Sequence, residues 1–508
     1  MFKGQPKGLF PLALANTGER FGYYTMIAVF ALFLRANFGL EPGTAGTIYS
    51  TFLALVYFLP LVGGILADKF GYGRMVTIGI LVMFFGYLLL SVPLGSGTVA
   101  LIGMMIALLL VSFGTGLFKG NLQVMVGDLY NDPQYAAKRD SGFSLFYMAI
   151  NIGALFAPTA AIKIKEWAEF SLGFDGNAAY HFSFAVACLS LIASIAIYYA
   201  FRSTFNHVEG GKGKKKDAAQ VVDTLTPEQT KSRMVALFLV FAVVIFFWMA
   251  FHQNGLSLTY FANEFTERSA SGLSSMPFNV WNLVAIIVIV YALFSIFDRE
   301  TSQRGKWIGC GVVVAAVAFL VWQYTRLSGS IAISAPIFQQ FNPFYVVALT
   351  PVSMAIFGAL AAKGKEPSAP RKIAYGMLVA AVAFGFMAFA SIGLNTPAFQ
   401  ETVRGTAEET LVSPYWLISV YLILTFGELL LSPMGISFVS KVAPPKYKGM
   451  MMGMWFVATA VGNFLVQVGG LLWGNIPLWI VWSVFLALCL ISAAFMFAMM
   501  RKLEAATK

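Results

Sequence analysis

Apolar stretches of about 20 residues, the length of helix that crosses a bilayer, recur along almost the whole chain. Of the 508 residues, 58% are hydrophobic and only 11% are charged, and the mean hydropathy is +0.75. Such a chain has too few charges to cover the surface of a soluble globule. The sequence lacks the alternating segments of about 10 residues that are typical of membrane β-barrels. It therefore predicts an all-α membrane protein.

The apolar stretches predict fourteen spanning helices in two groups. Six are expected at about 9–36, 45–67, 74–95, 98–126, 140–164 and 180–203. Eight are expected at about 234–263, 277–297, 307–326, 338–362, 373–394, 414–441, 448–473 and 476–501. We interpret 1–203 as an N-terminal six-helix bundle, 204–233 as a polar, basic cytoplasmic linker, and 234–508 as a C-terminal bundle with an extra helix pair at about 277–326.

The basic residues predict that both termini face the cytoplasm. With that topology, 26 of the 34 Lys and Arg residues lie in cytoplasmic loops and termini, 6 on the outer side and 2 within spans. Membrane topology accounts for the net charge of +11 without a nucleic-acid partner. The first apolar segment is too long for a signal sequence. We expect a multi-pass protein of a bacterial plasma membrane.

An internal repeat relates the two groups of helices. GTGLFKGN, a charged loop and FYMAINIGALFAP in the first half match FGELLLSPMGIS, a basic loop and MWFVATAVGNFLV in the second. Transporters built from such repeats bind their substrate between the two halves. The extra pair at 277–326 is the insertion that this repeat does not require.

Charged and polar residues within the first predicted helix are functional candidates, because ionisable groups within spans are costly. In NTGERFGYY, Glu19 and Arg20 lie one turn after Asn16, with Tyr23 and Tyr24 four residues beyond the two charges. A role in substrate or proton binding is one interpretation. A purely structural Glu19–Arg20 pair is the other.

Three further ionisable residues fall within predicted spans: Lys119, Glu428 and His252. Lys119 and Glu428 lie on repeat-related helices, so we expect them to approach near the membrane centre. Their ion pair could join the halves permanently or open and close with substrate and protons. The imidazole of His252 titrates near pH 6.5, which suits proton exchange, and a packed neutral histidine is the alternative. Cys188, Cys310 and Cys489 are expected to be packing residues, with no metal site or cofactor.

The loop GGILADKFGYGR between the second and third predicted helices combines glycines with charges. We interpret Gly64 and Gly71 as close-packing positions and Asp68, Lys69 and Arg74 as charges that bridge helix ends. This segment is expected to control conformational change.

These segments resemble a known family. The loop at Gly64–Gly71 resembles the GxxxD[KR]xG motif of the major facilitator superfamily. NTGERFGYY resembles the ExxERFxYY signature of the proton-dependent oligopeptide transporters, and GTGLFKGN, FYMAINIGALFAP and FGELLLSPMGIS resemble their fourth-, fifth- and tenth-helix motifs. The resemblance implies two six-helix bundles and proton-coupled import of di- and tripeptides by alternating access, with the monomer as the functional unit.

The resemblance also implies the binding residues. On the side of the peptide carboxylate and backbone it places Arg20, Tyr23, Tyr57, Lys119 and Asn151. On the amine side it places Asn342, Glu428 and Trp455, and Tyr24 and Thr459 would line the same cavity. A dipeptide is only about 7 Å long, so one cavity needs cations on one wall and a carboxylate on the other.

Two positions depart from the family pattern. The first glutamate of the signature is Asn16 here, and the acidic position of the seventh helix is His252. Asn16 cannot titrate, so we expect proton coupling to involve Glu19, Glu428 or His252 together with Arg20 and Lys119. A peptide facilitator with weakened coupling, or a transporter of another small zwitterion, anion or drug, is the alternative. An enzyme or sensor is disfavoured by the three histidines and the lack of a large soluble segment.

Overall fold

The computed structural model describes residues 4–136, 138–210, 225–298 and 301–506. These residues contain 14 helices that are long and apolar enough to cross a membrane, as the sequence predicted. The membrane-length helices of the first half are α1 (Leu9–Phe38), α2 (Pro42–Phe70), α3 (Tyr72–Ser91), α4 (Thr98–Asp128), α6 (Arg139–Phe170) and α7 (Tyr180–Ala200). Those of the second half are α8 (Pro227–Phe251), α10 (Val280–Phe297), α11 (Gln303–Thr325), α12 (Phe341–Ala362), α13 (Ala369–Ala390), α15 (Tyr415–Val442), α16 (Lys448–Leu465) and α18 (Leu478–Ala505).

Short elements complete the fold. They are the helices α5 (Pro133–Ala136), α9 (Ser257–Glu264), α14 (Pro397–Thr402) and α17 (Gln467–Leu471) and the strands β1 (Ser269–Ser271) and β2 (Ser330–Ala332). The strands pair antiparallel, with Ala270 opposite Ile331. They tie the loop after α9 to the loop after α11.

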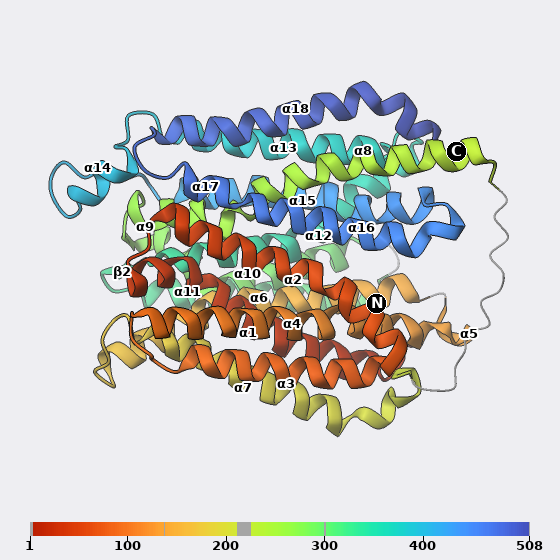
Figure 1. The fold of residues 1–508 in the computed structure, drawn as a ribbon, viewed down its shortest axis with the longest axis horizontal. Helices are drawn as coiled ribbons and strands as arrows, with labels where there is room; N and C mark the ends of the chain where they lie inside the picture. The colour runs from red at the N-terminus through yellow and green to blue at the C-terminus, as the bar shows by residue number, and fades with distance from the viewer. Residues whose placement is uncertain (1–3, 137, 211–224, 299–300, 507–508) are drawn as a thin grey trace.

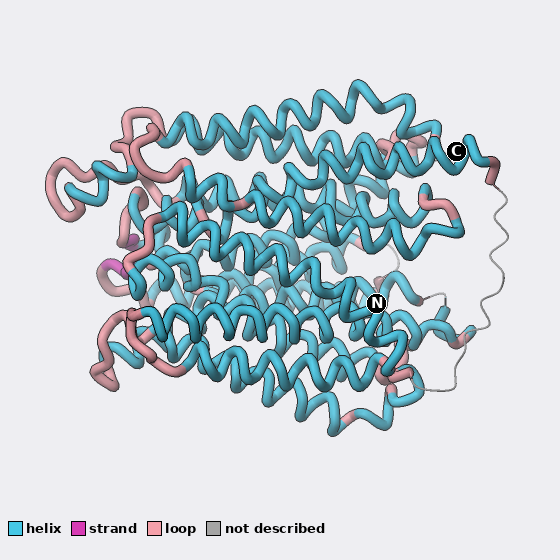
Figure 2. The backbone as a smooth tube through the Cα atoms, viewed as in Figure 1, coloured by secondary structure: helices cyan, strands magenta, loops and turns pink. Residues whose placement is uncertain are grey.

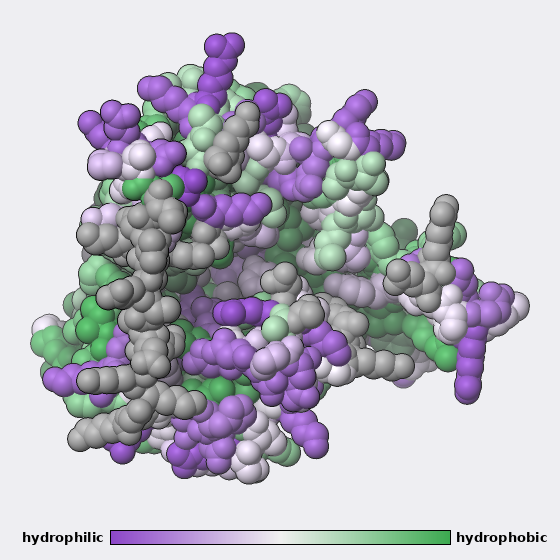
Figure 3. Space-filling view, turned by 90° about the vertical axis from the view of Figure 1, so that its right-hand side faces the viewer, coloured by the Kyte–Doolittle hydropathy of each residue, from purple (hydrophilic) through white to green (hydrophobic). Residues whose placement is uncertain are grey.

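The helices run side by side, and their connections gather at two ends (Figures 1 and 2). Both described ends of the chain lie at one end, which we call the terminal end, and β1, β2 and α14 lie at the other, the far end. The two halves meet where α2 packs against α16 and α17, and where α6 packs against α12. Viewed onto the terminal end, hydrophilic side chains surround a recess between the halves (Figure 3).

The α10–α11 pair lies at the edge of this assembly. The two helices contact each other, and α10 also packs against α12. Only 6% of the most apolar window of α11 is buried within the protein. In a chain of this composition such a surface faces lipid, so the pair leaves the packing between the halves intact.

The C-terminal part of the predicted linker 204–233 belongs to helix α8. Helix α8 begins at Pro227, where Thr226 caps it: the Gln229 N–H donates to Thr226 Oγ1 (3.2 Å), and the Thr226 N–H donates to Gln229 Oε1 (3.0 Å). This reciprocal pattern satisfies two backbone donors that a helix start leaves free. The linker residues 211–224 lie outside the described residues.

Two helices of the second half are interrupted side by side. After α8 the chain forms a short 3-10 turn, His252–Gly255, before α9 resumes, and α16 gives way to α17 at Val466. The Gln253 amide donates to the carbonyls of Met249 (3.1 Å) and Val466 (3.0 Å), and Ser257 donates to Gln253 Oε1 (2.6 Å). Because a lipid-buried break must satisfy its freed backbone groups internally, one side chain stabilises both interruptions.

Candidate functional site

Glu19 and Arg20 form a buried ion pair on α1. Arg20 Nε donates to Glu19 Oε2, and Arg20 Nη2 donates to Glu19 Oε1, both at 2.5 Å. The guanidinium also lies 4.6 Å from the centre of the Tyr23 ring. The pair neutralises Arg20 within its own helix, which a buried charge requires. This geometry fits the structural interpretation, and a ligand carboxylate would have to compete with Glu19 for the guanidinium.

Lys119 of α4 has a different environment. Its Nζ lies 3.9 Å from the centre of the Tyr57 ring on α2, an attractive cation–π geometry. Among the described residues no ion pair joins Lys119 to a carboxylate, so the expected Lys119–Glu428 pair is not formed in this structure. The ammonium therefore keeps its capacity to bind a ligand carboxylate.

Glu428 of α15 is held on the opposite half. Asn342 Nδ2 of α12 donates to Glu428 Oε2 (2.9 Å) and to Thr425 Oγ1 (3.0 Å). Tyr24 and Tyr57, both from the first half, lie within electrostatic range of Glu428. Among the residues that the structure describes, no cation forms an ion pair with Glu428, and its carboxylate interacts with tyrosines across the division between the halves.

Tyr147 of α6 completes this wall, and the sequence analysis missed it. Its side chain is 48% exposed although it lies within electrostatic range of Glu428, Tyr24 and Tyr57. Asn151, one turn later, donates from Nδ2 to the Tyr147 carbonyl (3.0 Å). The spacing of four residues in FYMAIN puts Tyr147 on the face of Asn151, a signal that could have identified it.

The structure buries two predicted residues in helix packing. Trp455 of α16 is 3% exposed, and a Cβ added to Gly435 of α15 would lie 1.9 Å from its ring. Thr459 donates to the Trp455 carbonyl (3.0 Å) within the same helix. In this arrangement the Trp455 ring packs between α15 and α16.

His252 sits at the interruption after α8. Its Nδ1 lies 2.5 Å from Asn463 Oδ1 on α16, and its ring stacks on Trp248 (centroids 5.2 Å apart). The Phe251 ring lies 5.4 Å from the His252 ring, and the Tyr57 ring, which also contacts Lys119, lies 6.1 Å from it. Lys119, Tyr57 and His252 thus form a continuous line of contacts from the first half to the second.

We expect His252→Gln to change the pH dependence of uptake between about pH 5 and pH 8, the range in which histidine exchanges protons. Glutamine can still bond to Asn463 but cannot titrate. The rate of uptake in His252→Gln should vary less with pH across this range than in the wild type. His207→Gln, which replaces an exposed histidine in a short 3-10 helix, should leave the pH profile unchanged. An unaltered pH profile in His252→Gln would show that His252 is a packing residue and does not exchange protons during transport.

A second group of charges joins the halves at the far end, and sequence analysis did not single it out. Arg35, at the end of α1, forms an ion pair with Glu264, at the end of α9, and lies 3.6 Å from Glu401. Trp473 donates from Nε1 to Glu264 Oε2 (2.9 Å). Charges at predicted helix ends were attributed to topology, so their pairing across the halves was not visible in the sequence.

The sequence profile described as the POT family matches residues 73–226 and 318–471, more than half of the chain. The chain belongs to the POT family. Among its relatives, uncharacterized transporter YclF of Bacillus subtilis (strain 168) is 30% identical over 496 residues, which cover 92% of this chain and 89% of YclF. A protein of Lactococcus lactis subsp. lactis (strain IL1403) named di-/tripeptide transporter is 27% identical and matches 91% of this chain and 88% of its own length.

Solved POT structures share the fold. The crystal structure of a mutant peptide transporter POT in complex with alafosfalin superposes with a TM-score of 0.74 at 23% identity, covering 100% of this chain and 97% of the other. The predicted family and the major facilitator fold with two additional helices are confirmed. POT proteins are transporters, so the expectation of a transporter and not an enzyme is confirmed as well.

The segment predicted to control conformational change covers the last turns of α2, the connection at Gly71 and the first turn of α3. Gly71 adopts a φ of +97°, which favours glycine, and its N–H donates to the Ala67 carbonyl (2.7 Å). Asp68 accepts a hydrogen bond from the Tyr72 hydroxyl (2.7 Å), and Lys69 Nζ lies 5.4 Å from the Phe70 ring. The expected charge bridges are absent: no ion pair joins Asp68 to Lys69 or Arg74, all three of which the structure describes.

The close-packing glycine near the end of α2 is Gly63, not Gly64 as predicted. A Cβ added to Gly63 would lie 2.1 Å from the Gly116 carbonyl oxygen on α4, whereas one added to Gly64 would meet nothing within 4 Å. Asn121 Nδ2 also donates to the Gly63 carbonyl (3.1 Å). The contact between α2 and α4 therefore depends on the glycine one position earlier.

We expect Gly63→Ala to destabilise the protein by about 1–3 kcal/mol, since the added methyl group overpacks the α2–α4 contact. Gly64→Ala is the matched control and should leave stability nearly unchanged. Thermal unfolding of both variants in detergent would measure the difference. Equal unfolding temperatures would contradict the assignment of Gly63 as the close-packing position.

Proposed function

We propose that this chain is a proton-coupled symporter that imports di- and tripeptides across the plasma membrane by alternating access. The observation that carries this proposal is the separation of Lys119 and Glu428 on opposite halves of the protein. Among the described residues, neither side chain forms an ion pair. A peptide has one carboxylate and one ammonium group, so it can complement both walls at once. The Lactococcus lactis relative, which is named di-/tripeptide transporter, supports the same substrate class.

Within this site we propose two sets of contacts. Lys119, with Tyr57 beside it, binds the peptide carboxylate, and Asn151 binds the peptide backbone. Glu428, held by Asn342, binds the amine, and Tyr147 lies on the same wall. Contacts to termini and backbone do not depend on peptide side chains, so broad selectivity is expected. Arg20 and Tyr23 contribute only if a ligand displaces Glu19.

For proton coupling we propose that His252, Glu428 and the Glu19–Arg20 pair exchange protons during the cycle, because Asn16 cannot. Each charge that moves through 100 mV gains about 2.3 kcal/mol, equivalent to roughly fifty-fold accumulation. We further propose that the basic terminal end faces the cytoplasm and that the monomer transports.

The test is uptake of labelled dialanine into proteoliposomes with an imposed inward proton gradient and an inside-negative potential. Accumulation above the outside concentration supports symport. Equilibration without accumulation would instead identify a facilitator whose coupling is lost at Asn16. No uptake of dialanine would contradict the peptide assignment.

A further inference from the structure

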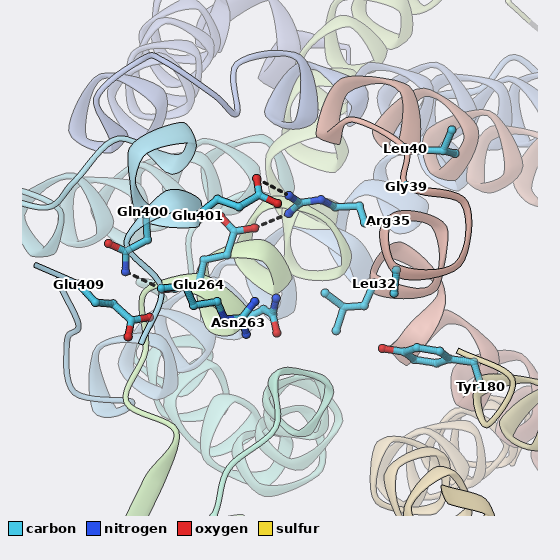
Figure 4. Close-up of a pocket in the computed structure, with 12 residues that line it drawn as sticks. Leu32, Arg35, Gly39, Leu40, Tyr180, Asn263, Glu264, Gln400, Glu401 and Glu409 are labelled. Atoms are coloured by element: carbon cyan, nitrogen blue, oxygen red, sulfur yellow. Dashed lines mark hydrogen bonds and ion pairs between the residues drawn. The ribbon is translucent and has the colours of Figure 1, made fainter. Parts of the chain in front are cut away.

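A cavity of about 380 Å³ lies at the far end (Figure 4), and neither Lys119 nor Glu428 lines it. The first half contributes Arg35 at the end of α1 and Tyr180 at the start of α7. The second half contributes Asn263 of α9 and the segment that carries Glu401 and Arg404. The volume is within the range of small-molecule sites, about 300–1,000 Å³.

Several polar groups at this cavity have spare binding capacity. Arg404, the Asn263 amide and the Tyr180 hydroxyl form no hydrogen bond or ion pair with another side chain that the structure describes. Glu401 is 71% exposed on its side chain and lies 3.6 Å from Arg35 Nη2, a loose ion pair. Arg404 also interacts electrostatically with Glu409, another residue of the lining. The cavity thus presents a guanidinium, a weakly held carboxylate and neutral donors together.

The segment that carries Glu401, Arg404 and Glu409 is held in place by contacts with the rest of the second half. Arg268 forms an ion pair with Glu409, Gln400 donates from Nε2 to the Glu264 carbonyl (2.9 Å), and Val412 pairs with Thr266. The hydrogen bond from Arg268 lowers the pKa of Glu409, so this pair is lost only as the pH falls below the usual range of a carboxyl group. The wall of the cavity is therefore ordered before any ligand arrives.

We propose that this far-end cavity is a second binding site, for small zwitterions with a separate ammonium and carboxylate, which for this chain are peptides. The ligand carboxylate pairs with Arg404, and its ammonium pairs with Glu401. The choice of peptides as ligands, and an outer location for the far end, rest on the proposed function.

The site binds weakly and communicates with the contact between the halves. Its charged groups are exposed to water, where ion pairs contribute little, so the dissociation constant is on the order of 1 mM. Arg35 contacts both Glu401 and Glu264 (Figure 4). A ligand that draws Glu401 away changes the surroundings of the Arg35–Glu264 pair, which joins α1 to α9.

The test measures dialanine binding without relying on transport. Ligand-detected saturation-transfer NMR is recorded on the purified double variant Lys119→Ala/Glu428→Gln, in which both walls of the central site are disabled. We expect residual millimolar binding that the further change Arg404→Ala weakens about threefold to fivefold. Arg326→Ala removes another far-end arginine outside the cavity and should have no effect.

A second comparison identifies the ammonium contact. In the same background, Glu401→Gln should weaken binding of dialanine but not of N-acetyl-dialanine, which lacks the ammonium group. No binding in the double variant, or equal binding with Arg404→Ala and Arg326→Ala, would overturn the far-end site. Failure of the proposed function appears separately, as absence of gradient-driven uptake by the wild type.

Discussion

The Lys119→Ala variant is expected to insert into the membrane but to lose concentrative dialanine uptake by a factor of at least roughly 30. Loss of one partner from a buried, hydrogen-bonded charge pair costs about 2–5 kcal/mol, and every 1.4 kcal/mol is about tenfold. Lys119 has no carboxylate partner among the described residues, so its charge is available to the substrate. Its removal also leaves the Tyr57 ring without the cation that covers it.

Lys163→Ala is the matched control, because the Lys163 side chain is 71% exposed and pairs with Glu166 on its own helix. Uptake by this variant should equal that of the wild type. The comparison requires equal amounts of reconstituted protein. Gel filtration before reconstitution checks that each variant is folded, and the orientation of the protein in the proteoliposomes must also be the same. Near-normal accumulation in Lys119→Ala would remove this lysine from the proposed site.

Replacement of Glu428 is expected to be equally severe. Glu428→Ala removes the carboxylate and leaves Asn342 with only Thr425 as a partner, whereas Glu428→Gln keeps an acceptor for Asn342. We expect both variants to lose uptake by at least roughly 30-fold, because both lose the charge that binds the peptide amine. The glutamine variant removes the charge but keeps the hydrogen bond to Asn342, so it distinguishes loss of charge from loss of packing.

Selectivity provides the sharper measurement for Glu428. Wild-type uptake of labelled dialanine should be inhibited by unlabelled dialanine far more strongly than by N-acetyl-dialanine. In Glu428→Gln this discrimination should disappear, since no carboxylate remains to prefer an ammonium. Retained discrimination would show that another group binds the amine, and Glu166→Gln provides a control at an exposed glutamate.

The helices and the family were predictable because apolar length and motif spacing are local properties of the chain. Contacts between the halves were not. Lys119 and Glu428 lie on repeat-related helices, yet the separation of those helices decides whether the two charges touch, and in this structure Asn342 binds Glu428 instead. Likewise, two adjacent glycines look equivalent in the sequence, and only the approach of Gly116 distinguishes Gly63 from Gly64.

The interruption at His252 was also missed by the sequence analysis. Residues 234–263 were predicted as one span although the polar run HQNG at 252–255 interrupts the apolar residues. The break itself depends on Gln253 reaching a carbonyl of another helix. Tyr147 was overlooked because its neighbours in FYMAINIG were interpreted through the family motif. Side-chain partners more than two hundred residues apart leave no periodic signal.

Because Gln253 stabilises both interrupted helices, we expect positions 253, 257 and 469 to have changed together during evolution. Gln253 fills its hydrogen-bonding capacity with Ser257 and the Val466 carbonyl, and a Cβ on Gly469 would lie 2.0 Å from its Oε1. A chain in which a shorter residue replaces Gln253 therefore has room for a side chain at position 469. In the same chain, a hydroxyl group at position 257 has no amide oxygen to which it can donate a hydrogen bond. Substitutions at these three sites should appear together in descendants of a common ancestor, as correlated changes rather than independent drift.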